Sequence, residues 1–130
     1  MIEDVHTDVT IRKAAQSDAE ALVDFIEPFV EQGVLLRRTL SEMKDLLDNF
    51  FLAEYEGDIV GCAALEIYNR KLCEIRSLAV SPRVQGMGVG KKLVAACIDR
   101  AREQQVYEIM AISSSENFFL ACGFNFTLPH

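Results

Sequence analysis

The sequence predicts a mixed α/β (α+β) fold, with a mostly antiparallel sheet of about six strands flanked by about four helices. Two observations support this prediction. Three strand-like segments between residues 50 and 80 are separated by short turns, which is typical of an antiparallel meander. A glycine-rich loop and a helical pattern then lead to an apolar strand at 107–112, and a crossover of this kind joins parallel neighbours.

The first part of the chain is predicted to contain one strand and two helices. Residues 9–13 alternate apolar and polar side chains, as a half-buried strand does. The Ser-Asp-Ala-Glu sequence at 17–20 has the order of a capping box and predicts a helix that Pro28 kinks or ends. Residues 39–42, Thr-Leu-Ser-Glu, form a second capping box before a short helix, whose inward-facing residues are expected to be Leu40, Met43 and Leu47.

The rest of the chain supplies the meander and the elements after it. A Glu-Gly-Asp turn joins the first two strands of the meander, and apolar residues at helical spacing follow the glycines. The predicted elements are strands 50–55, 59–67 and 72–80, a helix over 90–101, strand 107–112, a short helix after the serines at 113–115, and strand 124–128. We therefore expect one domain over residues 9–130, with residues 1–8 as an N-terminal extension.

The composition excludes several kinds of partner and site. With a formal net charge of −7, the chain lacks the basic footprint that nucleic acid or an anionic membrane requires. Its cysteines are far apart, and its histidines, His6 and His130, lie at the termini, so we expect no metal site. The absence of a disulfide pattern, a signal-like N-terminus and a long apolar run favours a cytoplasmic protein.

A glycine-rich loop follows the strand at 72–80. Ser81 and Pro82 stop the strand, glycines occupy positions 86, 88 and 90, and a helix is predicted to begin at once. The first turn of a helix has unpaired N–H groups and a partial positive charge, so this loop predicts an anion site. The loop is not a dinucleotide fingerprint, because Lys91 stands where the third glycine is needed, and it is not a Walker loop. A turn that merely joins strand to helix is the alternative.

The sequence Gln85-x-x-Gly88-x-Gly90 resembles the pyrophosphate loop of the GCN5-related N-acetyltransferase (GNAT) superfamily. Segments 74–80 and 118–124 stand before and after it in the family's order. The resemblance implies the GNAT fold, with a bulge and a splay after the fourth strand, and acetyl-CoA as co-substrate. It also implies that acetyl-CoA is held by the strand end and the loop, at Leu78, Ala79, Val80, Gln85, Gly86, Met87, Gly88, Val89, Gly90 and Lys91.

The same resemblance implies which groups move protons. Glu74 stands at the position of the family's general base, and in a regular strand residues 74, 76, 78 and 80 would share one face. The alternative is that Glu74 simply pairs with Arg76 or with a charge on a neighbouring strand. The family's general acid, a tyrosine, is replaced here by Phe119. Water or Ser115 would then protonate the leaving thiolate, although Ser115 also fits a plain helix N-cap.

The segment from Gln32 to Thr39 resembles the Q-G-[IV]-L-x-R-R-[ST] segment of N-acetylglutamate synthase acetyltransferase domains. Planar guanidinium groups bind carboxylates bidentately, and glutamate presents two carboxylates. Arg37, Arg38 and Arg76 are therefore the candidate substrate-binding residues, with one of the adjacent pair expected to face the site. The expected acceptor is the small-molecule amine glutamate or a related amino acid.

Two other functions stay open at this point. The chain would acetylate another small amine or a protein N-terminus if Arg37 and Arg38 were structural, or it would bind acetyl-CoA without catalysis. Synthase domains normally continue further past the final Gly-Phe than this chain does, which weakens the assignment to glutamate. A sheet edge left unpaired there would suit a second copy in a homodimer.

Overall fold

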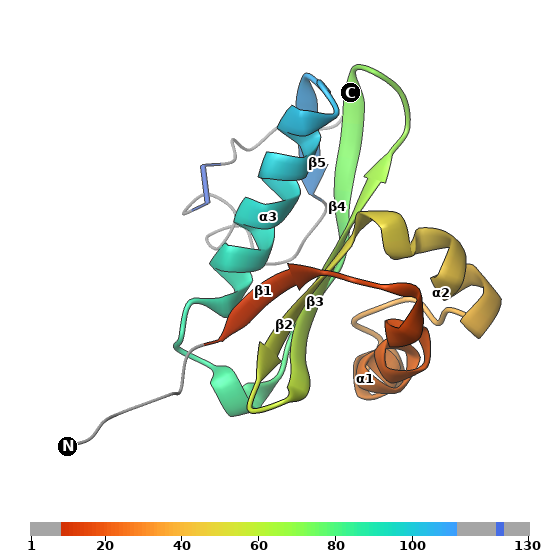
Figure 1. The fold of residues 1–130 in the computed structure, drawn as a ribbon, viewed down its shortest axis with the longest axis vertical. Helices are drawn as coiled ribbons and strands as arrows, with labels where there is room; N and C mark the ends of the chain where they lie inside the picture. The colour runs from red at the N-terminus through yellow and green to blue at the C-terminus, as the bar shows by residue number, and fades with distance from the viewer. Residues whose placement is uncertain (1–8, 112–121, 124–130) are drawn as a thin grey trace.

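The computed structural model describes residues 9–111 and 122–123, which form a five-stranded sheet with helices on both faces (Figure 1). The strands are β1 (Thr10–Lys13), β2 (Phe50–Tyr55), β3 (Asp58–Ile67), β4 (Leu72–Val80) and β5 (Glu108–Ala111). The helices are α1 (Ala19–Glu31), α2 (Leu40–Leu46) and α3 (Val89–Glu103), with 3-10 turns at Gln16–Asp18, Leu47–Asn49 and Pro82–Val84. The predicted mixed α/β class is confirmed, whereas the predicted fourth helix and sixth strand lie outside the described residues.

The sheet has the order β1-β2-β3-β4-β5, and its strands are antiparallel except for β4 and β5, which are parallel. The β2–β3 hairpin turns at Glu56 and Gly57, whose φ angles of 53° and 84° are both positive, as a type I′ turn requires. The parallel pair follows because α3 carries the chain back across the sheet between β4 and β5. The predicted meander and crossover are therefore confirmed.

Two hydrophobic layers cover the two faces of the sheet. On one face α3 packs through Leu93, which is fully buried, and on the other α1 and α2 bury Leu22 and Met43 (Figure 1). Gly61 on β3 permits the close approach of α3, because a Cβ at this position would lie 3.1 Å from Leu93 Cδ1. Among the helices of residues 9–111, none combines the length and apolar character that a membrane crossing needs.

A β-bulge interrupts β4 at Ser77. The pairing with β3 shifts between Cys62 and Ala64, and Ser77 has a φ of 55°, so β4 carries one extra residue here. Leu78 consequently packs with the core under α3, whereas Ala79 packs with the core under α1 and α2. The expectation that residues 74, 76, 78 and 80 share one face is therefore wrong beyond residue 76, because the bulge reverses the alternation.

The start of α1 differs from the prediction. The 17–20 capping box does not form, because the Asp18 carboxylate accepts hydrogen bonds from Ala15 N–H and from Arg12 instead. Pro28 does not end the helix, which continues to Glu31. Pro28 is exposed, so water can satisfy the carbonyl that loses its helical donor. The second predicted capping box, between Thr39 and Glu42, forms as expected.

Asp18 links β1 to α1 and makes folding depend on pH. The hydrogen bonds from Arg12 lower the pKa of Asp18, so its stabilising contribution is complete above the ordinary aspartate pKa, about 4, and is lost as pH falls through the lower folded-state value. We expect Asp18→Asn to lower the free energy of unfolding by about 1–2 kcal/mol at pH 7. Urea unfolding at neutral and acidic pH measures this difference, which should shrink in acid. Asp24→Asn, an exposed change on α1, is the matched control and should have little effect at either pH.

Candidate active site

Four polar side chains form a square on the α1–α2 face of the sheet, where β3 ends and β4 begins. Glu66 on β3 lies directly opposite Glu74 on β4, and like charges in such positions repel each other. Arg76 offsets this repulsion through an ion pair with Glu66, with 3.1 Å between Nη1 and Oε2. Tyr68 occupies the remaining corner and donates its O–H to Glu74. The Arg76–Glu66 and Tyr68–Glu74 pairs thus each connect the end of β3 with the start of β4.

Glu74 is the buried carboxylate of the square, with 8 % of its surface exposed. Tyr68 Oη lies 2.5 Å from its Oε1. Within the described residues, the Glu74 carboxylate accepts this hydrogen bond from a neutral donor, the phenol of Tyr68. Charged side chains are seldom buried without a cationic partner. Oε2 is therefore an oxygen that can accept a proton.

Glu66 and Tyr68 have fixed protonation states near neutral pH. The nearby hydroxyl of Tyr68 is the largest effect that lowers the pKa of Glu66, and Arg76 and Arg38 lower it further. The hydrogen bond to Glu74 and the neighbouring carboxylate of Glu66 raise the pKa of Tyr68, so the phenol keeps its proton. Glu66 accordingly stays a carboxylate, and Tyr68 stays a donor.

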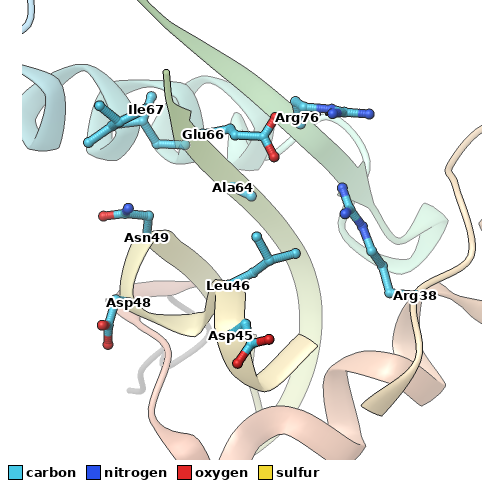
Figure 2. A pocket seen from close by; sticks show the side chains of 10 residues that line it. Arg38, Asp45, Leu46, Asp48, Asn49, Ala64, Glu66, Ile67 and Arg76 are labelled. Carbon is cyan, nitrogen blue, oxygen red and sulfur yellow. Dashed lines mark hydrogen bonds and ion pairs between the residues drawn. The ribbon is translucent and has the colours of Figure 1, made fainter. Parts of the chain in front are cut away.

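A pocket of about 190 Å³ opens between α2 and two members of the square, Glu66 and Arg76 (Figure 2). Figure 2 shows Arg38, from the connection between α1 and α2, and Arg76 reaching toward the same side of the pocket, close to Glu66. Nε of Arg38 is buried and has no hydrogen-bond partner in the described part of the chain. Two guanidinium groups at one pocket can bind a carboxylate through paired hydrogen bonds.

Arg37 lies differently from Arg38. Its guanidinium forms an ion pair with Glu27 of α1, and its side chain is 64 % exposed. Arg37 is not among the residues that line the pocket, whereas Arg38 is. The structure thus brings Arg38 and Arg76 together and places Arg37 on the surface beside α1.

The loop between β4 and α3 has the geometry of an anion cradle. Gly86 and Gly88 have φ angles of 83° and 73°, and no side chain caps the start of α3. Lys92 N–H donates to Gly88 O at 3.1 Å, so the N–H groups before it have no helical acceptor. A Cβ on either glycine would meet nothing within 4 Å, so the space in front of the loop is open. With Lys91 exposed beside these N–H groups, the loop fits a pyrophosphate.

The end of β4 presents backbone groups next to this cradle. The described part of β5 pairs with β4 from Leu72 to Ile75, and the bulge at Ser77 comes directly after. The bulge implied by the resemblance is therefore present. Residues that would complete a splay, from Ile112 onward, lie outside the described part, and so do the predicted acid Ser115 and Phe119.

Sequence reasoning missed two members of the site. They are Glu66, within the strand predicted over 59–67, and Tyr68, directly after that strand. The signal that could have found them is their spacing of two residues, which places them on one face if the strand continues into the turn. Their proximity to Glu74 depends on the β3–β4 register, which could not be predicted from the sequence. The described residues hold no cluster of metal ligands.

These features agree with a family assignment. The model of the acetyltransferase (GNAT) family matches residues 17–124, which include β4, the glycine loop and α3. The chain belongs to the GNAT family. Its bulged fourth strand and the uncapped helix after it are thus the parts of a GNAT domain that the resemblance predicted.

The chain is also similar to individual GNAT proteins. An uncharacterized N-acetyltransferase of Chlorobaculum tepidum is 32 % identical over 117 residues, covering 90 % of this chain and 76 % of that protein. The amino-acid acetyltransferase of Neisseria meningitidis is 36 % identical over 114 residues, covering 87 % of this chain and 26 % of that protein. The crystal structure of N-acetylglutamate synthase from Neisseria gonorrhoeae, complexed with coenzyme A and N-acetyl-glutamate, matches with a TM-score of 0.78 and 34 % identity. That match covers 90 % of this chain and 28 % of the synthase, so the chain spans about a quarter of each Neisseria protein.

Proposed function

We propose that this GNAT domain transfers an acetyl group from acetyl-CoA to the α-amino group of glutamate or a closely related amino acid. The observation that carries the proposal is the pocket that Arg38 and Arg76 both line, next to Glu66, which stands directly opposite the buried Glu74 in the β3–β4 pair. The likeness to amino-acid acetyltransferases supports an amino acid as the acceptor. Acetyl-CoA, when bound, supplies the acetyl group as a thioester.

The glycine loop would hold the pyrophosphate of acetyl-CoA. Its free N–H groups at the start of α3 and the positive charge of Lys91 offer hydrogen bonds and an attractive field for that group. Leu78 and Val80 lie at the end of β4 beside the loop, and their backbone groups would receive the pantetheine arm. Binding of the anionic pyrophosphate requires local positive charge such as that of Lys91, because the chain as a whole is acidic.

Glu74 would act as the general base. The α-amino group of an amino acid is mostly protonated at pH 7, and the protonated amine cannot attack a carbonyl. Oε2 of Glu74 can receive this proton directly or through one water molecule. Glu66 is a poorer acceptor, because the lowered pKa and the ion pair with Arg76 stabilise its ionised form.

Arg38 and Arg76 would bind the carboxylates of the amino acid. Arg76 uses Nη1 for Glu66 and keeps its other N–H groups for a ligand, and Arg38 has an unpaired Nε among the described residues. We therefore expect Arg38→Ala to raise the KM for glutamate by about ten- to a hundredfold, as the loss of a charged hydrogen-bonded pair does. Arg37→Ala is the matched comparison, and its effect should be smaller because Arg37 points to Glu27.

The test is the release of free thiol from acetyl-CoA by the purified protein with a panel of amines. The panel contains glutamate, glutamine, aspartate, a polyamine and a basic peptide. The proposal predicts turnover of glutamate or glutamine well above the rest, and its loss in Arg38→Ala. Turnover of another amine, unaffected by Arg38→Ala, would reject an amino-acid acceptor. Binding of acetyl-CoA with no turnover of any amine would indicate a non-catalytic acetyl-CoA-binding module.

A further inference from the structure

Tyr68 has no part in the proposed mechanism, although it contacts the proposed base. It follows β3 at the turn into β4, where its backbone N–H donates to Leu72 O at 3.0 Å. The residue is 47 % exposed, yet its hydroxyl lies 2.5 Å from the carboxylate of Glu74, which is buried. An exposed ring whose polar atom reaches a buried charge gains little from packing. Its position is better explained by the hydrogen bond.

We infer that Tyr68 is a positioning residue that holds the Glu74 carboxylate in the orientation leaving Oε2 available for the proton of the amine. This inference rests on the proposed role of Glu74 as the general base. Tyr68 acts through Glu74 and is not itself a proton donor to the reaction, because the neighbouring carboxylates raise its pKa and retain its proton.

A neutral donor suits this role better than a cation. An arginine bound to Glu74 would stabilise the charged carboxylate strongly and make it a weaker base. In this structure Arg76 forms its ion pair with Glu66, and Glu74 accepts its hydrogen bond from Tyr68 instead. The other charged groups that line the pocket in the described part are Arg38, from the α1–α2 connection, Asp45 of α2, and Asp48 in the 3-10 turn after it.

The inference predicts a specific change in kinetics for Tyr68→Phe. We expect kcat to fall about tenfold, with an unchanged KM for acetyl-CoA, because a base that is free to rotate is less often aligned. Tyr55→Phe removes a hydroxyl at the opposite end of the sheet and is the matched control, with wild-type kinetics expected.

A double-mutant cycle separates the inference from the proposed function. If Tyr68 acts through Glu74, Tyr68→Phe will have no further effect on the rate in a Glu74→Gln protein. Equal losses in both backgrounds would overturn the role of Tyr68 while leaving Glu74 as the base. Full activity of Glu74→Gln alone would instead reject the base, and with it the inference.

A spectroscopic titration tests the contact without any turnover. Tyrosinate absorbs in the near ultraviolet, and subtracting the Tyr68→Phe titration from that of the wild type isolates Tyr68. We expect this phenol to ionise above the usual range for tyrosine, and to ionise at a lower pH in Glu74→Gln. A Tyr68 titration that does not respond to Glu74→Gln would show that the hydrogen bond is absent and would overturn the inference.

Discussion

Replacing Glu74 with glutamine should lower kcat by roughly a hundredfold or more, because the amine then lacks a group to accept its proton. Glutamine has nearly the same shape as glutamate and can still accept a hydrogen bond from Tyr68 through its carbonyl oxygen. Affinity for acetyl-CoA should be unchanged, because Cys73 and Ile75 pack under α3, which puts Glu74 on the opposite face of the sheet from the helix that the glycine loop begins. Steady-state kinetics and calorimetric titration with acetyl-CoA measure the two quantities.

The pH dependence of this variant is diagnostic. As the pH rises toward about 9, a growing share of the amine is already neutral, so the deficit of Glu74→Gln should become smaller. Glu66→Gln serves as the comparison, because it removes a carboxylate directly opposite on β3. Its effect should be smaller and should appear mainly in the KM for the amine, since it frees Arg76 from its ion pair. A large loss of kcat in Glu66→Gln with little change in Glu74→Gln would assign the base to Glu66.

The second large effect is expected for Gly88→Glu, which should lower acetyl-CoA affinity by at least about a hundredfold. A carboxylate on the N-cap of α3 would stand in the open space before the loop and repel a pyrophosphate at short range. Calorimetry with coenzyme A and acetyl-CoA measures the loss. The effect should weaken in high salt, because ions screen a repulsion between exposed charges.

Two control variants separate charge from backbone strain. Gly88→Ala has the same unfavourable positive φ and no charge, so it should keep most of the affinity while losing about 1–2 kcal/mol of stability. Gly57→Glu places the same side chain at a positive φ of 84° in the β2–β3 hairpin and should bind acetyl-CoA normally. Unchanged affinity in Gly88→Glu would show that the loop is not the pyrophosphate site.

Local chemistry was sufficient to predict much of the fold. The meander strands, the Glu56–Gly57 turn, the Thr39 cap and the start of α3 after the glycines depend on residues close together in the sequence. The capping box at 17–20 failed because Arg12, on another element, draws Asp18 into an ion pair. A propensity that is correct locally is overridden when a distant charge offers a stronger partner.

The site was predicted less completely than the fold. The residue types needed for the proposed chemistry, Glu74, the arginines and the glycine loop, could be identified by their motifs. The motif could not show which of Arg37 and Arg38 lines the pocket, because this depends on the ion pair between Arg37 and Glu27 of α1. The role of Tyr68 was also hidden, since the turn after β3 gave no sign that its hydroxyl reaches β4.

The sequence by itself determined the family, the class of fold and the loop at the start of α3, because these depend on motifs and on periodicity within single elements. Only the tertiary structure decided which side chains meet. The physical reason is visible in β4, where one extra residue at Ser77 moves the side chains that follow it to the opposite faces of the sheet. The β3–β4 register then sets two carboxylates opposite each other, and gives Glu66 the cation Arg76 and Glu74 the neutral hydroxyl of Tyr68 as partners.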